Sequence, residues 1–182
     1  SHEAQHDIYA RPGDKLRWLN ELIGHASVIP LVSSYRVLKM THLEHHKHTN
    51  NPDLDPDYDT HAPSALTAIW KALKARNPKS EFLESYEKTL DRLDQEQAGL
   101  ARRDGIFINL CYLAVLFAMA ATGHALEAFL LWVLPLVLAL VYIRFFLAWA
   151  PHHPGHETGR YHDTRAFKSL FGVIGTMGMT VH

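Results

Sequence analysis

Two long apolar stretches occupy much of the second half of the chain. Residues 106–123 (IFINLCYLAVLFAMAATG) contain no charged side chain, and residues 128–150 (AFLLWVLPLVLALVYIRFFLAWA) contain only Arg144. A helix of about 20 apolar residues spans the hydrocarbon core of a lipid bilayer. Two core helices of a soluble bundle would need more amphipathic partner helices than this sequence offers. The pattern therefore predicts two membrane-spanning helices, at residues 106–123 and 128–150.

The charges beside these stretches predict how the two helices are oriented. The short link from His124 to Glu127 has no Lys or Arg. Basic residues flank the outer ends of both stretches instead: Arg102, Arg103, Arg160, Arg165 and Lys168. Basic residues concentrate in the cytoplasmic loops of membrane proteins. We therefore expect a helical hairpin with both outer ends in the cytoplasm and the link on the opposite side.

The rest of the chain is more polar and predicts shorter helices. Asp14 is a candidate N-cap for a helix over residues 15–23. Residues 22–40 are moderately apolar, and Pro30 would kink a helix there, so we expect an interfacial or re-entrant segment. Residues 64–104 predict one or two polar helices, and the spacing of their apolar side chains indicates a cytoplasmic helix that packs on the membrane face or on a neighbouring element.

Length, charge and cysteine content limit the class of protein. The 182 residues suit one domain, and a net charge of −1 gives no case for binding nucleic acid. Cys111, the single cysteine, lies inside the first apolar stretch, so no disulfide framework is expected. Residue 1 is Ser rather than Met, and a histidine cluster begins at residue 2. We therefore expect residues 1–182 to be one partial domain from a larger protein.

Histidines gather in two short clusters ahead of the apolar stretches. The first is HEAQH at residues 2–6, and the second is HLEHH at residues 42–46. Residues three or four apart project from the same face of a helix, so the histidines of each cluster would converge. Imidazole is a common neutral ligand of iron, zinc and copper. Five histidines exceed the needs of one tetrahedral metal, so the spacing predicts a polynuclear metal site.

The first cluster also matches the HExxH pattern of zinc proteases, in which two histidines bind zinc and the Glu is the general base. Asp53 is a candidate for the distal Asp of an intramembrane protease, but Leu54 stands where those proteases have Gly. A single zinc would also leave the second cluster without a role. A bis-imidazole haem protein would need single histidines within facing spans, whereas these clusters lie at span ends. The intramembrane protease is kept as a distant alternative to a polynuclear site.

Four acids alternate along the segment after the second cluster: Asp53, Asp55, Asp57 and Asp59. A calcium-binding EF-hand loop that began at Asp53 would need Gly at position 58 and Glu at position 64, where this chain has Tyr58 and Ser64. Pro52 and Pro56 disfavour that loop further. We interpret the segment as an acidic turn whose carboxylates are close enough in sequence to support nearby histidines.

The order of the clusters ahead of a helical hairpin resembles the membrane fatty acid desaturase superfamily. That superfamily also includes acyl and alkane hydroxylases and carotenoid hydroxylases and ketolases. Its first histidine box corresponds to HEAQHD at residues 2–7, and its second to HLEHHKHTN at residues 42–50. Members carry a third box, HxxHH, and residues 178–182 (GMTVH) look like its beginning. The resemblance covers essentially the whole chain, and it implies that the upstream spans and most of the third box lie outside residues 1–182.

The resemblance implies an all-α integral membrane fold in which a transmembrane hairpin joins a cytoplasmic helical cap that carries two iron ions. The box histidines are the implied iron ligands: His2, His6, His42, His45, His46 and His182. Members often add one histidine after the last span, for which we choose His152 ahead of His153 and His156. Three acids are close enough in sequence to orient imidazoles by accepting their second N–H: Glu3, Asp7 and Glu44.

The resemblance also implies an oxidoreductase that uses dioxygen and two electrons to oxidise C–H bonds of a lipid. The electrons would come from an external donor, such as a ferredoxin, a cytochrome b5-like protein or a rubredoxin. The histidine boxes do not separate desaturation from hydroxylation. Residues 48–57 (HTNNPDLDPD) are similar to segments of β-carotene hydroxylases and of some bacterial desaturases. We favour a fatty acyl desaturase, with carotenoid ring hydroxylation as the alternative.

Overall fold

The computed structural model consists of helices and connecting loops throughout the residues that it describes, which are 2–10, 13–153 and 169–176. This agrees with the predicted all-α class. The chain folds into two compact units, and each combines segments that are distant in sequence. The first unit contains Ser1–Leu43 and Thr89–Leu136, and the second contains Glu44–Lys88 and Val137–His182.

The first unit begins with α1 (His2–Gln5), α2 (Trp18–Val28) and the start of α3 (Tyr35–His48). Helix α2 starts later than the sequence predicts, because the backbone N–H of Arg17 bonds to the carbonyl of Asp14 in a turn, 3.1 Å away. It ends where Pro30, which lacks a backbone N–H, enters the short 3₁₀-helix η1 (Ile29–Leu31).

The core of this unit forms where α1 and α2 meet the first residue of α3. Ala4, Val28 and Tyr35 are completely buried there, and the Tyr35 hydroxyl donates a hydrogen bond of 2.7 Å to the carbonyl of Ala4. A Cβ atom on Gly24 would lie 2.2 Å from Cζ of the Tyr35 ring, so only glycine allows this close approach. Tyr35 thereby fixes the short histidine-bearing helix α1 against α3.

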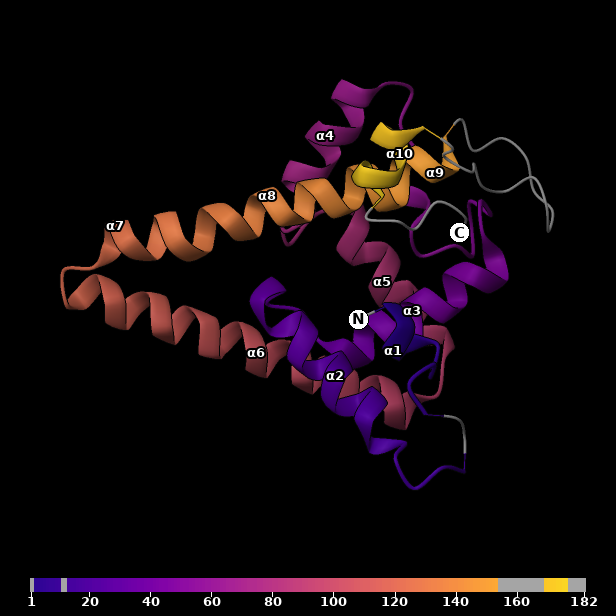
Figure 1. Ribbon diagram of the computed structural model, residues 1–182, viewed down its shortest axis with the longest axis horizontal. Helices are drawn as coiled ribbons and strands as arrows, with labels where there is room; N and C mark the ends of the chain where they lie inside the picture. Colours follow the sequence, from indigo (N-terminus) through magenta and orange to yellow (C-terminus); the bar gives the residue numbers. More distant parts are fainter. Residues whose placement is uncertain (1, 11–12, 154–168, 177–182) are drawn as a thin grey trace. The chain divides into compact units, whose positions relative to one another are not determined.

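The two predicted spans correspond to two long apolar helices, the first of which ends at Ala121, two residues before the predicted end at Gly123 (Figure 1). The first is α6 (Gln95–Ala121), which Asp94 caps by accepting a 2.9 Å hydrogen bond from the backbone N–H of Gln97. The second runs without interruption over Ala125–His152. Both are long and apolar enough to cross a membrane, with 27 and 28 residues.

Gly123, with a backbone φ of 86°, stands between the two long helices. The second helix then comprises α7 (Ala125–Ala128), a π-helical turn η3 (Phe129–Val133) and α8 (Leu134–Tyr142). It continues through a second π-helical segment, η4 (Ile143–Trp149), into α9 (Ala150–His152). Near the link, the rings of Tyr112 and Trp132 pack edge to face at 5.1 Å, which joins the two helices as the predicted hairpin.

In the second unit, shorter elements pack against the C-terminal half of this helix. The loop after α3 contains the 3₁₀-helix η2 (Tyr58–Thr60) and leads to α4 (Ala65–Lys74) and α5 (Glu81–Arg92). Residues 64–104, predicted as one or two polar helices, thus form α4, α5 and the beginning of α6. Helix α10 (Leu170–Gly175) is fastened by the Tyr142 hydroxyl, which donates a 2.7 Å hydrogen bond to the Gly175 carbonyl.

Candidate metal centre

Three of the predicted ligands face one another in the first unit. His2 and His6 extend from α1 and His42 from α3, and the three ring centroids are 4.7, 4.8 and 4.9 Å apart. The Nε2 atoms of His6 and His42 are only 3.0 Å apart. The Tyr35 contact with α1 and an ion pair of 2.7 Å between Lys39 and Asp7 hold the two helices in this arrangement.

The protonation state of His2 suits metal binding. Burial lowers the pKa of His2 below its usual value, and the nearby His6 lowers it further. The neutral imidazole is therefore favoured at neutral pH, which is the form that coordinates a metal. A donor set made only of imidazole nitrogens fits iron as well as zinc or copper. His46 lies one helical turn beyond His42 on α3, so it projects from the same side of that helix.

A second pair of predicted ligands meets in the other unit. His45 and His152 are both buried, and their rings pack edge to face with centroids 4.9 Å apart. Asp55 lies behind His45, with its Oδ1 atom 2.8 Å from Nδ1 of the imidazole. A carboxylate accepts hydrogen bonds, so Nδ1 of His45 carries the proton and Nε2 is the nitrogen that can coordinate a metal.

Three of the four alternating acids form hydrogen bonds with three different helical segments. Asp55 accepts from His45 on α3, Asp57 accepts a 3.0 Å hydrogen bond from the Tyr86 hydroxyl on α5, and Asp59 accepts from Arg144 on η4. Burial raises the pKa of Asp57. Burial also raises the pKa of Asp59, to about 6, although the Arg144 guanidinium opposes that shift. The acidic turn therefore ties α3, α5 and η4 together in the second unit.

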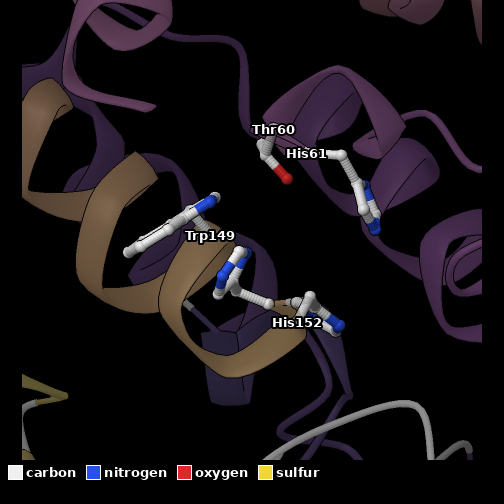
Figure 2. Close-up of a pocket in the computed structure, with 5 residues that line it drawn as sticks. Thr60, His61, Trp149 and His152 are labelled. Carbon is white, nitrogen blue, oxygen red and sulfur yellow. The ribbon is translucent and has the colours of Figure 1, made fainter. Parts of the chain in front are cut away.

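A narrow pocket lies beside His152 (Figure 2). Trp149 and His152 reach it from the end of the second apolar helix, and Thr60 and His61 reach it from η2 and the residue after it. The Trp149 indole N–H donates to the Ala62 carbonyl at 3.0 Å, which fixes the wall of the pocket. His61 is fixed as well, because its Nδ1 atom lies 3.0 Å from the Tyr58 carbonyl.

The rings of the adjacent residues His152 and His153 have different neighbours. His152 contacts His45, whereas the ring of His153 packs on Trp149 at 4.6 Å between centroids. His156 and His182 lie outside the described residues.

Two of the three acids expected to orient imidazoles, Asp7 and Glu44, pair with lysines. Asp7 pairs with Lys39 at 2.7 Å, and Glu44 pairs with Lys47 at 2.5 Å and lies 3.7 Å from His48. Asp55 contacts the box histidine His45, and the signal for it in the sequence is the alternation of acids shortly after the second cluster.

Comparison with known proteins agrees with the histidine pattern. A family model described as fatty acid desaturase matches residues 1–182. An sn-1 oleoyl-lipid 12-desaturase from Picosynechococcus is 28% identical over 78 residues, 39% of this chain and 22% of that protein. The same enzyme from Anabaena variabilis is 42% identical over 50 residues, 28% of this chain and 14% of the relative.

A zeaxanthin 4-ketolase from Chlamydomonas reinhardtii is similar over more of the chain. It is 26% identical over 159 residues, which cover 86% of this chain and 29% of the ketolase. The chain thus spans less than a third of the length of these relatives. No solved structure matches it. Because the family model matches the whole chain, the chain belongs to the fatty acid desaturase family.

Proposed function

We propose that the protein containing this chain is a membrane-bound di-iron oxidoreductase that oxidises C–H bonds of a lipid. The observation that carries the proposal is the pairing of histidine boxes in space: imidazoles of the first box face His42 of the second, and His45 meets His152. The proposed ligands are the predicted ones: His2, His6, His42, His45, His46, His152 and His182. Two iron ions bound by them would supply the dioxygen-dependent oxidation of the C–H bond.

The chain's own residues hold and orient these ligands. Burial favours the neutral form of His2, and the Tyr35 hydroxyl keeps α1 in contact with α3. Asp55 fixes the tautomer and the ring orientation of His45. Asp55 also accepts a 2.8 Å hydrogen bond from the backbone N–H of Asn50, which fixes the chain just after α3. A ligand set held in this way needs little rearrangement when metal binds.

The two apolar helices support a location of the protein in a membrane. We expect both to cross the bilayer, with the histidine clusters on the cytoplasmic side where the flanking Arg and Lys residues concentrate. One relative, from Nostoc, is named an sn-1 acyl-lipid omega-3 desaturase (ferredoxin). That name supports a ferredoxin as the external electron donor, ahead of a cytochrome b5-like protein or a rubredoxin.

Acyl desaturation is the favoured reaction, because the oleoyl-lipid and acyl-lipid relatives carry that activity in their names. Carotenoid ring oxidation is the second candidate, because the ketolase is similar over most of the chain. The two differ in substrate rather than in the proposed ligands. The HExxH zinc protease considered from the sequence is set aside, because the family model that matches the whole chain is that of fatty acid desaturases.

The deciding experiment expresses the full-length protein, with a compatible ferredoxin, in a host that makes both fatty acyl lipids and carotenoids. Lipid profiles would be compared with those of a His45→Ala variant at equal expression. A new acyl double bond supports desaturation, and an oxygenated ring supports carotenoid oxidation. Unchanged lipids and carotenoids, together with zinc and no iron in the purified protein, would overturn the proposal.

A further inference from the structure

Helix α4 exposes its large apolar side chains and buries its small ones. Ala68 and Ala72, one helical turn apart, are each 5% exposed. Leu66, Trp70 and Leu73 occupy another face of the helix and are 80%, 58% and 50% exposed. Spacings of four and three residues align these three side chains in one stripe. A short helix in water would bury such a stripe, so the stripe indicates an apolar environment on its outer side.

The position of α4 along the apolar helix Ala125–His152 follows from the segment that it packs against. Helix α4 packs on η4, the segment Ile143–Trp149 of that helix. At 1.5 Å per residue, η4 lies roughly 5 to 14 Å from the end of the helix at His152. Amphipathic helices at a membrane surface bury their apolar face about 5–10 Å into the boundary between headgroups and acyl chains. In the proposed membrane location, the segment η4 that α4 contacts therefore lies at the depth of that boundary.

The charged residues near α4 fit the same environment. Nζ of Lys74 lies 4.4 Å from the centroid of the Trp70 ring, so an aromatic ring and a cation sit together on the exposed face. Trp and Lys are the residue types that anchor protein segments at lipid headgroups. Three basic residues follow within a few positions, Lys74, Arg76 and Lys79. They complement the negative charge of phospholipid headgroups.

We propose that α4 lies in the membrane interface and that phospholipid covers its outer face. Leu66, Trp70 and Leu73 contact the upper acyl chains, and Lys74 stays at the level of the headgroups. The occupant is lipid rather than another protein, because α4 is packed against the end of a helix that itself meets lipid. This inference rests on the proposed location of the protein in a membrane.

Site-directed spin labelling of the full-length protein tests the inference. Cys111→Ala and replacement of any other cysteine provide the background, and a nitroxide is attached at Leu66→Cys on α4. The matched control is Glu84→Cys on the polar helix α5, and Leu138→Cys on α8 reports on the proposed span. The protein is reconstituted in bilayers of neutral and anionic phospholipid. Collision of the label with oxygen, which enters lipid, is compared with collision with a water-soluble nickel chelate.

For Leu66→Cys we expect oxygen collisions to outweigh nickel collisions, although less strongly than for Leu138→Cys. For Glu84→Cys the ratio should be inverted. A nickel accessibility at Leu66→Cys equal to that at Glu84→Cys would place α4 in water, and a label shielded from both reagents would mean that protein covers it. Either result overturns the inference while Leu138→Cys still reports lipid. Nickel access at Leu138→Cys would instead overturn the proposed membrane location.

Discussion

The orientation of the His45 imidazole depends on a hydrogen bond to the carboxylate of Asp55, ten residues further along the chain. Asp55 is buried and binds Nδ1 of His45 directly, so it sets which ring nitrogen is available to a metal. Outer carboxylates of this kind typically change metal affinity by about 10–100-fold when they are removed. The Asp55 side chain is therefore a positioning residue in the proposed site, although it binds no metal itself.

We expect Asp55→Asn to bind iron about 10–100-fold more weakly, because the amide is a poorer acceptor for the imidazole N–H than the carboxylate. Iron content would be measured against a series of chelator concentrations, and helicity by circular dichroism. Asp53→Asn, in the same loop with an exposed side chain, is the control and should keep both properties. Equal chelator resistance of Asp55→Asn and the unmodified protein would remove the positioning role.

Two adjacent histidines at the end of the second apolar helix provide a second comparison at this scale. His152→Ala should lower iron content and abolish lipid oxidation, because the structure brings this ring to His45. His153→Ala should keep both, because its ring packs on Trp149 instead. Metal analysis and product formation would be measured on both variants at equal expression. Loss of iron in the His153 variant alone would reverse the assignment.

At the scale of elements, the packing of α2 on α3 depends on one glycine. Gly24→Ala would put a methyl group 2.2 Å from a ring carbon of Tyr35, and overpacking of a core costs about 1–3 kcal/mol. Gly99→Ala on α6 is the matched control, because no atom lies within 4 Å of its added Cβ. That control should stabilise its helix by about 0.5–1 kcal/mol.

Thermal unfolding in one detergent would measure both glycine variants. The Gly24 variant should unfold at a lower temperature and also bind less iron, since Tyr35 ties α1 to α3. The Gly99 variant should unfold at the same or a higher temperature. An unchanged unfolding temperature for Gly24→Ala would mean that α2 and α3 are not in the close contact described above.

The second apolar helix is tied to the acidic turn by a buried ion pair. Arg144 and Asp59 are both at least nine-tenths buried, and the Arg144 guanidinium also lies 4.3 Å from the centroid of the Phe82 ring. Removal of one partner from a buried pair typically costs about 3–5 kcal/mol, because the other charge stays behind. Arg144→Met should therefore strongly lower the unfolding temperature.

Arg102→Met is the matched control for that variant, because Arg102 pairs with Asp91 on an exposed surface. Exposed pairs contribute about 0–1 kcal/mol, so its unfolding temperature should hardly change. A combined Arg144→Met, Asp59→Leu variant should be more stable than Arg144→Met alone, since neither buried charge is then unpaired. Equal unfolding temperatures for the two single Arg variants would contradict the structural role of the buried pair.

For the whole molecule, the sequence predicted the features that depend on local composition. The apolar stretches appear as long helices because about 20 consecutive apolar residues satisfy their backbone hydrogen bonds within one helix. The histidine clusters converge because helical spacing brings i and i+4 to one face. Helix α6 begins 11 residues before the predicted span, at Gln95 rather than Ile106, because its polar first turns continue the same helix.

Contacts between distant residues could not be predicted in the same way. The acidic turn was expected to support nearby histidines, and Asp55 does so at His45, but the partners of Asp57 and Asp59 lie 29 and 85 residues away along the chain. No local pattern distinguishes His152 from its neighbour His153. The second apolar helix ends at His152, and His153 already has an extended backbone, so the two rings point to different neighbours. Nothing in the local sequence around Gly24 indicates that the fold uses this glycine for the Tyr35 contact.

The orientation of the whole protein in the membrane is the broadest prediction. A single cysteine at Leu126→Cys in the hairpin link, in a Cys111→Ala background without other cysteines, should react with an impermeant maleimide on intact cells. A cysteine at Asp53→Cys should react only after the membrane is permeabilised, because basic residues flank the outer helix ends and favour the cytoplasmic side. The opposite labelling pattern would reverse the predicted orientation. Equal labelling of both positions on intact cells would mean that the hairpin does not cross the membrane.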